Sequence, residues 1–318
     1  MLIINFLILL VGLFLVVKGA DILISSAVTI GKKYGVSDFF IGLILIGFGT
    51  SLPELLVSID AIIKESPEIS IGNVLGSNIS NILLVLGVAL FISKLDLRKI
   101  KRFDNLFHLF IHILFLLIVW LLIFDYKIGV FFLALFSFYI YKSFNNSFTN
   151  KDNEFETNDF LSKIVFKKPL TIGFPIIIFS IVLTFFGAEF TVDSVIEISS
   201  FFGISDSFLA LTLVALGTSL PEIITSIRAA QKNMPELIIG NIIGSNIYNL
   251  LLILGFVSLF EAFIFPKNIL FFEVIFLIMC VLGFSLLLYL KKEVNKKFSW
   301  VFITFYFFYL FKLFLTNF

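Results

Sequence analysis

Ten stretches of the chain are apolar all round and contain few charged residues. They lie at about 2–30, 37–62, 70–92, 105–124, 128–143, 170–200, 206–231, 237–259, 268–290 and 298–317. A helix needs about 20 mostly apolar residues to cross the hydrocarbon core of a bilayer. A strand of a membrane barrel would instead show about ten residues of alternating polarity. The pattern therefore predicts an all-α integral membrane protein with ten transmembrane helices.

The composition of the 318-residue chain excludes a soluble domain. Hydrophobic residues make up 59% of the chain and charged residues only 14%, whereas soluble domains contain about 25% charged residues. The net charge of +1 leaves no basic surface for nucleic acid. We therefore expect the protein to lie in the lipid bilayer, with no nucleic-acid partner and no obligatory protein partner.

The basic residues gather on one side of the predicted membrane segments. If the first helix begins outside, the loops after the odd-numbered helices face the cytoplasm, and these loops carry most of the 23 lysines and arginines. The opposite loops carry only Lys64, Lys127 and Lys267. Because cytoplasmic loops are enriched in Lys and Arg, we expect a multi-pass protein of the cell membrane with both termini extracellular.

Two segments of the chain occur twice with few changes. GFGTSLPELLVSI at 47–59 returns as ALGTSLPEIITSI at 215–227. At the same spacing, IGNVLGSNISNILLVLG at 71–87 returns as IGNIIGSNIYNLLLILG at 239–255. The chain therefore contains one unit that has been duplicated.

Each copy of this unit holds five predicted helices. Because five is an odd number, the second copy enters the membrane from the opposite side. We therefore predict two inverted five-helix repeats, residues 1–144 with the motif at 47–87 and residues 169–318 with the motif at 215–255. Residues 145–168 form the longest polar stretch and are expected to be a cytoplasmic linker.

Two glutamates, Glu54 and Glu222, hold matching positions in the duplicated motifs and lie inside apolar segments. An ionised carboxylate in such a segment costs at least about 2.5–3.5 kcal/mol. A structural role would require a basic partner, and neither glutamate has a Lys or Arg three or four residues away, on the same helix face. Two such residues at equivalent positions therefore indicate a functional site.

Hydroxyl and amide side chains accompany each glutamate on the same or the following predicted helix. They are Thr50, Ser51, Ser77 and Asn81 in the first copy, and Thr218, Ser219, Ser245 and Asn249 in the second. Pro53 and Pro221 have no N–H for the carbonyls four residues earlier, which leaves these oxygens free. One Ser or Asn alone is more often a packing residue. Together with the carboxylates, these oxygens are typical ligands of a hard cation such as calcium or sodium.

His108 and His112 lie four residues apart in the fourth predicted helix. No Glu stands where an HExxH metal site requires one, and we expect the pair near the cytoplasmic end, where side chains reach the lipid headgroups. No Ser or Cys has a recognisable base beside it in the sequence. We therefore expect neither a metal site at this pair, nor a cofactor, nor an enzyme.

Lys18 and Asp21 lie in the first predicted helix, and Glu189 and Asp193 lie in the related part of the sixth. We interpret Lys18 and Asp21 as marking the cytoplasmic end of one helix, and the other two as marking the external end of its counterpart. Snorkelling or ion pairing explains charges at such positions, and a role in gating is the alternative. We do not assign them to the cation site.

The two GTSLPE segments and the GN-x-x-GSN segments that follow them resemble the alpha repeats of the sodium/calcium exchanger family, particularly its prokaryotic members. The resemblance implies an antiporter that exports calcium in return for sodium, with three sodium ions for each calcium ion. It also implies alternating access, in which helices 1 and 6 slide across the other eight. Na⁺ and Ca²⁺ would then be transported substrates, not cofactors.

The same resemblance implies the ligands of the transported ions. Glu54 and Glu222 would be the central ligands, accompanied by Asn81 and Asn249. In the family, further residues complete the ion sites through hydroxyl or carbonyl oxygens, and they match Thr50, Ser51, Ser77, Thr218, Ser219 and Ser245 of this chain. Two residues that contribute backbone oxygens match Gly47 and Ala215.

Asn249 departs from several relatives in this family, which carry Asp there. Potassium-dependent relatives are among them, whereas the potassium-independent animal exchangers resemble this chain in having Asn at both central positions. We therefore expect independence of potassium. The alternative is a Ca²⁺/H⁺ antiporter, although the proton-exchanging branch typically shows GNxxE where this chain shows GTSLPE. A channel with two glutamates at a constriction is a further possibility.

Overall fold

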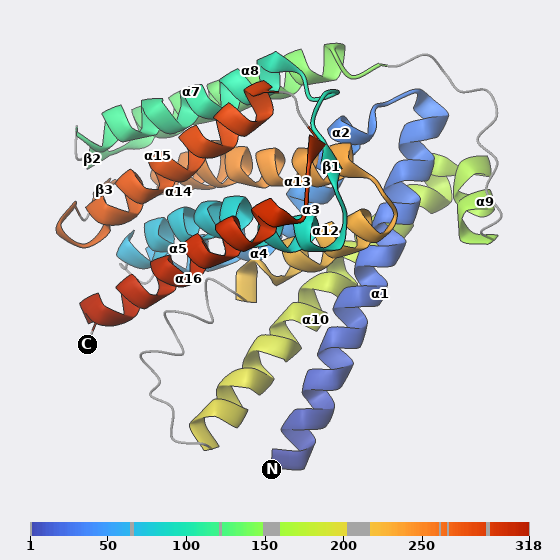
Figure 1. Ribbon diagram of the computed structural model, residues 1–318, viewed down its shortest axis with the longest axis horizontal. Helices are drawn as coiled ribbons and strands as arrows, with labels where there is room; N and C mark the ends of the chain where they lie inside the picture. The colour runs from blue at the N-terminus through green and yellow to red at the C-terminus, as the bar shows by residue number, and fades with distance from the viewer. Residues whose placement is uncertain are drawn as a thin grey trace.

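The computed structural model is helical through nearly all of the residues that it describes (Figure 1). These residues are 2–63, 67–120, 123–148, 160–201, 217–260, 262–265, 267–290 and 293–317. Within them, seven helices are long and apolar enough to cross a membrane, or eight if the bent pair Asp38–Thr50 and Leu52–Ile63 forms one span. The predicted helical fold, with several helices suited to cross a membrane, is confirmed.

The first half of the chain contains eight α-helices, two π-helical segments and two short strands among its described residues. They are α1 (Leu2–Tyr34), α2 (Asp38–Ile41), η1 (Gly42–Ile46), α3 (Gly47–Thr50), α4 (Leu52–Ile63), α5 (Pro67–Ser80), η2 (Asn81–Val85), α6 (Leu86–Ile92), β1 (Leu95–Asp96), α7 (Arg102–Val119), β2 (Ile123–Phe124) and α8 (Tyr126–Asn145).

The second half begins with two additional segments and a long helix, and its later described elements then repeat the order of the first half. Its described elements are α9 (Phe160–Lys167), η3 (Pro169–Gly173), α10 (Phe174–Phe201), α12 (Leu220–Gln231), α13 (Pro235–Ile247), η4 (Tyr248–Ile253), α14 (Leu254–Phe260), β3 (Phe263–Ile264), α15 (Lys267–Leu290), β4 (Glu293–Val294) and α16 (Lys297–Asn317). The predicted helix 206–231 is described only from residue 217 onward.

Three predicted spans, 37–62, 70–92 and 237–259, are each divided into shorter helical segments. The first bends by 42° between α3 and α4, just before Pro53, which cannot continue the hydrogen-bond pattern. The other two change to a π-helical turn, η2 and η4, at equivalent places in the two halves. π-helical turns inside α-helices occur frequently at functional sites.

The end of one predicted helix needed a correction. The helix predicted over 105–124 ends at Val119, and residues 123–124 form strand β2, which pairs antiparallel with β3. Phe124 stacks on Phe263 with ring centroids 5.2 Å apart. Strand β1 pairs antiparallel with β4 in the same way. Two-residue strands escape sequence patterns because their hydrogen-bond partners lie in the other half of the chain.

Part of the predicted linker is a helix. Residues 160–167 form α9, which packs against α1. The hydroxyls of Ser25 and Ser162 lie 3.0 Å apart, and Lys33 Nζ donates to the Phe166 carbonyl at 2.5 Å. The start of the second half is therefore held against the first helix.

Close helix packing in the centre of the molecule depends on glycine. The segment from α2 to α3 packs on α13, and all residues of α13 from Leu237 to Ile247 are buried. A Cβ added to Gly240 would lie 2.1 Å from the Phe39 carbonyl oxygen, and one at Gly244 would lie 2.6 Å from the Leu43 carbonyl oxygen. Because backbone meets backbone here, no larger residue fits.

The long helices α1 and α10 lie side by side and extend together away from the other helices (Figure 1). Gly12 and Gly187 face each other across this contact, and a Cβ on Gly187 would lie 2.7 Å from the Val16 nitrogen. Small residues let membrane helices approach closely in this way. The two helices therefore form a tightly packed pair at the edge of the bundle.

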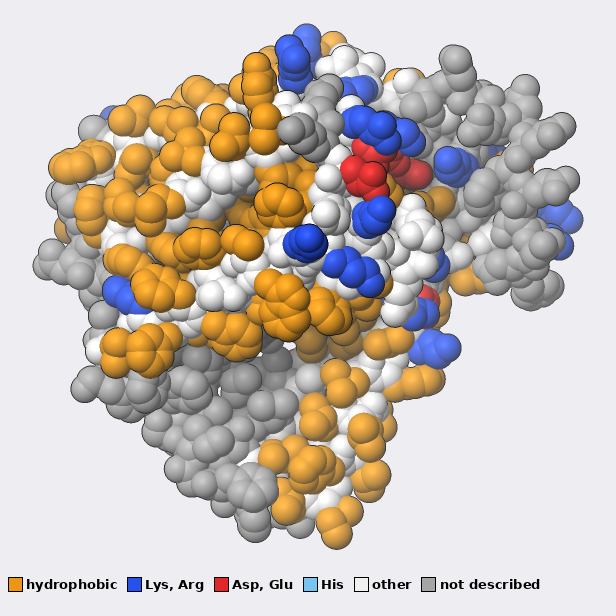
Figure 2. All heavy atoms as spheres, viewed as in Figure 1, with side chains coloured by type: hydrophobic (Ala, Val, Ile, Leu, Met, Phe, Trp, Pro, Cys, Tyr) orange, Lys and Arg blue, Asp and Glu red, His pale blue; other side chains and the backbone are white. Residues whose placement is uncertain are grey.

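Apolar side chains dominate the surface over α15 and α16, and charges gather around β1 and α2 (Figure 2). Hydrogen bonds from Arg98 lower the pKa of Asp96 to about 2. Lys99 forms an ion pair of 2.8 Å with Glu236. These charged groups lie together at one end of the bundle, and its apolar sides are suited to lipid contact.

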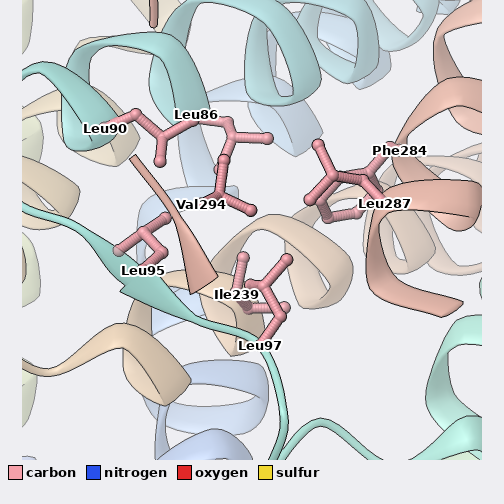
Figure 3. Close-up of a pocket in the computed structure, with 8 residues that line it drawn as sticks. All are labelled: Leu86, Leu90, Leu95, Leu97, Ile239, Phe284, Leu287 and Val294. Atoms are coloured by element: carbon pink, nitrogen blue, oxygen red, sulfur yellow. The ribbon is translucent and has the colours of Figure 1, made fainter. Parts of the chain in front are cut away.

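The pocket in Figure 3 is entirely apolar. It lies between β1, β4 and the helices α6, α13 and α15, and its lining residues are Leu86, Leu90, Leu95, Leu97, Ile239, Phe284, Leu287 and Val294. None of these side chains carries a polar group. The pocket therefore belongs to the packing of the bundle and offers no ligand for an ion.

We expect Gly240→Ala to destabilise the protein by about 1–3 kcal/mol, because its Cβ forces two packed backbones apart. Thermal unfolding in detergent measures the loss. Gly283→Ala is the matched control, because a Cβ at Gly283 would meet no atom within 4 Å. Equal melting temperatures for the two variants would contradict the role of the close contact.

Candidate ion-binding site

Glu54 and Glu222 each stand in the first turn of a helix that follows a break. α3 ends at Thr50 and α4 begins two residues later, with Glu54 in its first turn. Glu222 holds the same place in α12, directly after Pro221. The amino terminus of a helix carries a partial positive charge that stabilises a carboxylate. The sequence Ser-Leu-Pro-Glu thus positions each acid where the helix favours it.

Serine hydroxyls bind one oxygen of each carboxylate. Ser77 Oγ on α5 donates to Glu54 Oε1 at 3.3 Å, and its counterpart Ser245 Oγ on α13 donates to Glu222 Oε1 at 3.4 Å. Ser51 Oγ crosses from the first half to donate to Glu222 Oε1 at 3.3 Å. The side chains of Glu54 and Glu222 are 0% and 1% exposed. The two acids therefore lie in one buried polar cluster.

Asn73 and Asn241 join the two halves of this cluster. Thr218 Oγ1 donates to Asn73 Oδ1 at 3.3 Å, and Thr50 Oγ1 donates to Asn241 Oδ1 at 3.4 Å. Asn73 Nδ2 donates in turn to Ser58 Oγ at 3.0 Å. The sequence analysis did not select either asparagine. A buried Asn at matching positions of two apolar helices was the signal that could have revealed them.

Four side-chain oxygens in this region are buried and accept no hydrogen bond from the described residues. They are Glu54 Oε2, Glu222 Oε2, Asn81 Oδ1 and Asn249 Oδ1. A buried acceptor without a donor is unfavourable by about 1–3 kcal/mol, and more for a charged group. Carboxylate, amide and hydroxyl oxygens are ligands for hard cations. The cluster therefore has the ligand chemistry that such a cation requires.

The remaining predicted site residues lie in the same cluster wherever the structure describes them. Ser219 Oγ donates to Ser77 Oγ at 3.5 Å. The Gly47 carbonyl oxygen accepts a hydrogen bond from Ser245 Oγ at 3.5 Å. Ala215 lies outside the described residues. The structure thus brings together residues that are up to about two hundred positions apart in the chain.

The expected position of His108 and His112 near the headgroups was wrong. Both side chains are fully buried. His112 Nε2 lies 3.4 Å from Asn78 Nδ2, and His108 Nε2 lies 3.1 Å from Asn246 Nδ2. Helix α7 packs against α13 and α15, which directs this face of the helix into the protein. The depth of a side chain depends on such packing and cannot be read from its own helix.

The sodium/calcium exchanger protein family matches residues 4–145 and 172–315 of the chain. The chain belongs to the sodium/calcium exchanger family. It is similar to the sodium/calcium exchanger MaX1 of Methanosarcina acetivorans, with 36% identity over an alignment of 307 residues. The match covers 86% of this chain and 87% of that protein. It also resembles the putative antiporter CaxA of Alkalimonas amylolytica, with 32% identity over 253 residues and 77% of both chains covered.

A solved structure of the sodium/calcium exchanger from Methanococcus jannaschii has the same fold. The TM-score is 0.83 at 31% sequence identity, and the match covers 98% of each chain. Proteins of the exchanger family are membrane antiporters rather than catalytic enzymes, and their substrates are Na⁺ and Ca²⁺. The buried oxygen cluster fits that class of substrate.

A cavity of about 320 Å³ reaches the buried polar cluster around the two glutamates from one side. Thr218, which also contacts Ser77 in the cluster at 3.4 Å, forms part of its wall. Three carboxylates, Asp60, Glu189 and Asp193, line the cavity as well. Carboxylates lining a cavity raise the local concentration of cations. The cavity is therefore suited to admit a cation.

An ion pair joins α1 to α12 elsewhere in the bundle. Arg228 Nε donates to Asp21 Oδ1 at 2.6 Å, and Arg228 Nη2 donates to Asp21 Oδ2 at 2.5 Å. Asp21 therefore pairs across the two halves of the chain. Lys18, three residues away, lies over the Phe14 ring at 5.8 Å from its centroid.

We expect the Asp21–Arg228 pair to contribute a coupling free energy of about 0.5–3 kcal/mol, because the two side chains are in direct bidentate contact. Asp21→Asn and Arg228→Gln should each lower the unfolding temperature in detergent. The double variant should then be less destabilised than the sum of the two. Strict additivity would show that the pair contributes nothing to stability.

Proposed function

We propose that the protein exchanges Na⁺ for Ca²⁺ across the cell membrane by alternating access, with three sodium ions for each calcium ion and without potassium. The single observation that carries this proposal is the set of buried oxygens on Glu54, Glu222, Asn81 and Asn249 that accept no hydrogen bond from any described residue. The family of the chain supports the two ions as substrates.

Shared ligands explain why the two ions would exchange. Ca²⁺ takes six to eight oxygen ligands, and we assign Glu54 and Glu222 as the central ones. The proposed set is completed by the amide oxygens of Asn81 and Asn249, the hydroxyls of Thr50, Ser51, Ser77, Thr218, Ser219 and Ser245, and the backbone oxygens of Gly47 and Ala215. Because Na⁺ binds the same classes of oxygen, the two ions compete, and one must leave before the other binds.

The charges of the site support an electrogenic cycle. Two ionised glutamates carry a charge of −2, so one Ca²⁺ neutralises them and three Na⁺ leave a charge of +1. An empty pair of carboxylates is costly to move through a dehydrated state. The protein therefore changes conformation readily only when the site is loaded, which couples the two fluxes.

Ten spans in two inverted five-helix repeats are the arrangement we propose for the whole chain. Matching hydrogen bonds support it, such as Ser77 to Glu54 at 3.3 Å and Ser245 to Glu222 at 3.4 Å. The strands β1 and β3 hold equivalent places in the two halves, as do β2 and β4, so the pair β1–β4 is the counterpart of the pair β2–β3. The basic residues gather in the loops after the odd-numbered helices, and cytoplasmic loops are enriched in Lys and Arg. In the proposed topology, both termini therefore lie outside and the linker 145–168 lies in the cytoplasm.

The cavity and the ion pair support alternating access in this topology. Asp60, Glu189 and Asp193 lie toward the ends of helices that face outside in the proposed topology, and they line the cavity. The Asp21–Arg228 pair lies toward the cytoplasmic ends and joins α1 to α12. Opening to the cytoplasm requires this pair to separate as α1 and α10 slide past the other helices.

The central experiment measures radioactive calcium uptake into proteoliposomes loaded with Na⁺ and diluted into Na⁺-free buffer. Sodium-driven uptake that generates a membrane potential and needs no potassium is the expected result. Vesicles that carry only a pH gradient test the alternative of a Ca²⁺/H⁺ antiporter. Uptake driven by the pH gradient alone would overturn the proposal.

Glu54→Gln and Glu222→Gln should each abolish sodium-driven calcium uptake, because each removes half of the charge that holds Ca²⁺. The variants should remain folded, since a neutral side chain is easier to bury in a membrane helix. Glu273→Gln, which neutralises a buried glutamate on α15 outside the cluster, is the matched control and should retain transport. Wild-type exchange in either site variant would contradict the assignment.

Asn249→Asp should make transport sensitive to pH or potassium, because it adds a third carboxylate to the site. The measurement compares sodium-driven calcium uptake across a range of pH and with or without potassium. A pH and potassium profile identical to that of the wild type would reject a selectivity role for this position.

A further inference from the structure

Four asparagines and two histidines form a second buried polar cluster beside the glutamates. Asn78, Asn81, Asn246 and Asn249 come from the two repeated motifs, and all are at most 1% exposed. His108 and His112 reach them from α7, where the two rings lie 4.4 Å apart. The first half of the chain supplies both histidines, so this cluster departs from the internal symmetry.

The backbone fixes the proton on His112. Its Nδ1 lies 2.7 Å from the His108 carbonyl oxygen, which can only accept a hydrogen bond. Nδ1 therefore carries the hydrogen in the neutral ring, and Nε2 is left as an acceptor. Asn78 Nδ2 lies 3.4 Å from this Nε2 and 3.3 Å from the backbone carbonyl oxygen of Asn246. Both neighbours require a donor, so Asn78 must direct its NH₂ group toward them.

The orientation of Asn78 determines that of Asn249. With its NH₂ group engaged, Asn78 directs Oδ1 toward Asn249, whose Nδ2 donates to it at 2.9 Å. The Asn249 amide therefore uses its nitrogen on this side, and its own Oδ1 is left buried without a donor among the described residues. The reversed amide would set two oxygens against each other and direct NH₂ toward the cation site, where it would repel Na⁺ or Ca²⁺.

A related path leads to Asn81 but lacks the backbone anchor. Asn81 Nδ2 donates to Asn246 Oδ1 at 3.1 Å, and Asn246 Nδ2 lies 3.1 Å from His108 Nε2. His108 Nδ1 has no hydrogen-bond partner among the described residues. The tautomer of His108 is thus not fixed as that of His112 is. The path from His112 to Asn249 is the better defined of the two.

We propose that His112 is a positioning residue of the cation site. Through Asn78 it holds the Asn249 amide with its carbonyl oxygen available to the cation, and it thereby sets the affinity for Ca²⁺. This inference rests on the proposed function, because it takes Asn249 as a ligand of the transported ion. His112 itself binds no ion.

The test compares calcium binding and transport in His112 variants of the purified protein. His112→Leu removes the acceptor for Asn78 and should raise the calcium dissociation constant about tenfold, while the maximal exchange rate stays within about twofold. His112→Gln restores an acceptor oxygen and should recover most of the affinity. Asn105→Leu is the matched control, because Asn105 is a buried amide on α7 that donates to Ser285 instead. It should leave the calcium affinity unchanged.

A double variant separates positioning from packing. Asp at position 249 presents oxygens in either orientation, so His112→Leu should have no further effect on calcium affinity in the Asn249→Asp background. A purely structural role would lower affinity or stability equally in both backgrounds and would overturn the proposal. An unchanged dissociation constant in His112→Leu would overturn it as well. If that variant does not fold, Asn78→Leu breaks the same path and is judged by the same outcomes.

The wild-type protein distinguishes this inference from the proposed function. If the wild type neither binds Ca²⁺ nor exchanges it for Na⁺, the proposed function fails, and the positioning role falls with it. If the wild type does both and the His112 variants behave like the Asn105 control, only the positioning role fails.

Discussion

Two carboxylates buried among apolar helices impose the constraint on which the rest of this structure depends. Glu54 and Glu222 are almost completely inaccessible, and an ionised group in such surroundings is unfavourable unless other groups compensate. Two helix amino termini and the hydroxyls of Ser77 and Ser245 supply part of the compensation. The second oxygen of each carboxylate accepts no hydrogen bond from the part of the chain that the structure describes. These two oxygens have the chemistry of ligands for a hard cation.

The compensating groups come from four different spans, so the backbones must approach closely. Gly42, Gly240 and Gly244 allow this, because an added Cβ at each would lie within 2.6 Å of a carbonyl oxygen on the facing segment. Side chains as short as Ser and Thr reach the glutamates only at such helix separations. The hydrogen bonds of the site therefore depend on these glycines, because only closely packed helices bring the short side chains to the glutamates.

The repeated unit builds nearly the same half-site twice, and the departures from symmetry differentiate the two sides. Asp21 and Arg228 attract each other, whereas the residues at the corresponding positions, Glu189 and Asp60, are both acidic and line the cavity. The histidines of α7 likewise have no counterparts in α15, where Phe276 and Cys280 occupy the matching positions. These differences distinguish the two halves, while the residues proposed as cation ligands match between them.

The sequence by itself determined the apolar spans and the duplicated motif, because both are local patterns. It also selected the two glutamates and the serines that contact them, since an acid in an apolar helix is unfavourable wherever the helix packs. Only the tertiary structure decided that Asn73 and Asn241 join the halves, that Arg228 pairs with Asp21 and that the histidines face inward. The tertiary structure also decided that the short strands pair, β1 with β4 and β2 with β3. Each of these features depends on which helices are neighbours, and the periodicity of a single helix does not contain that information.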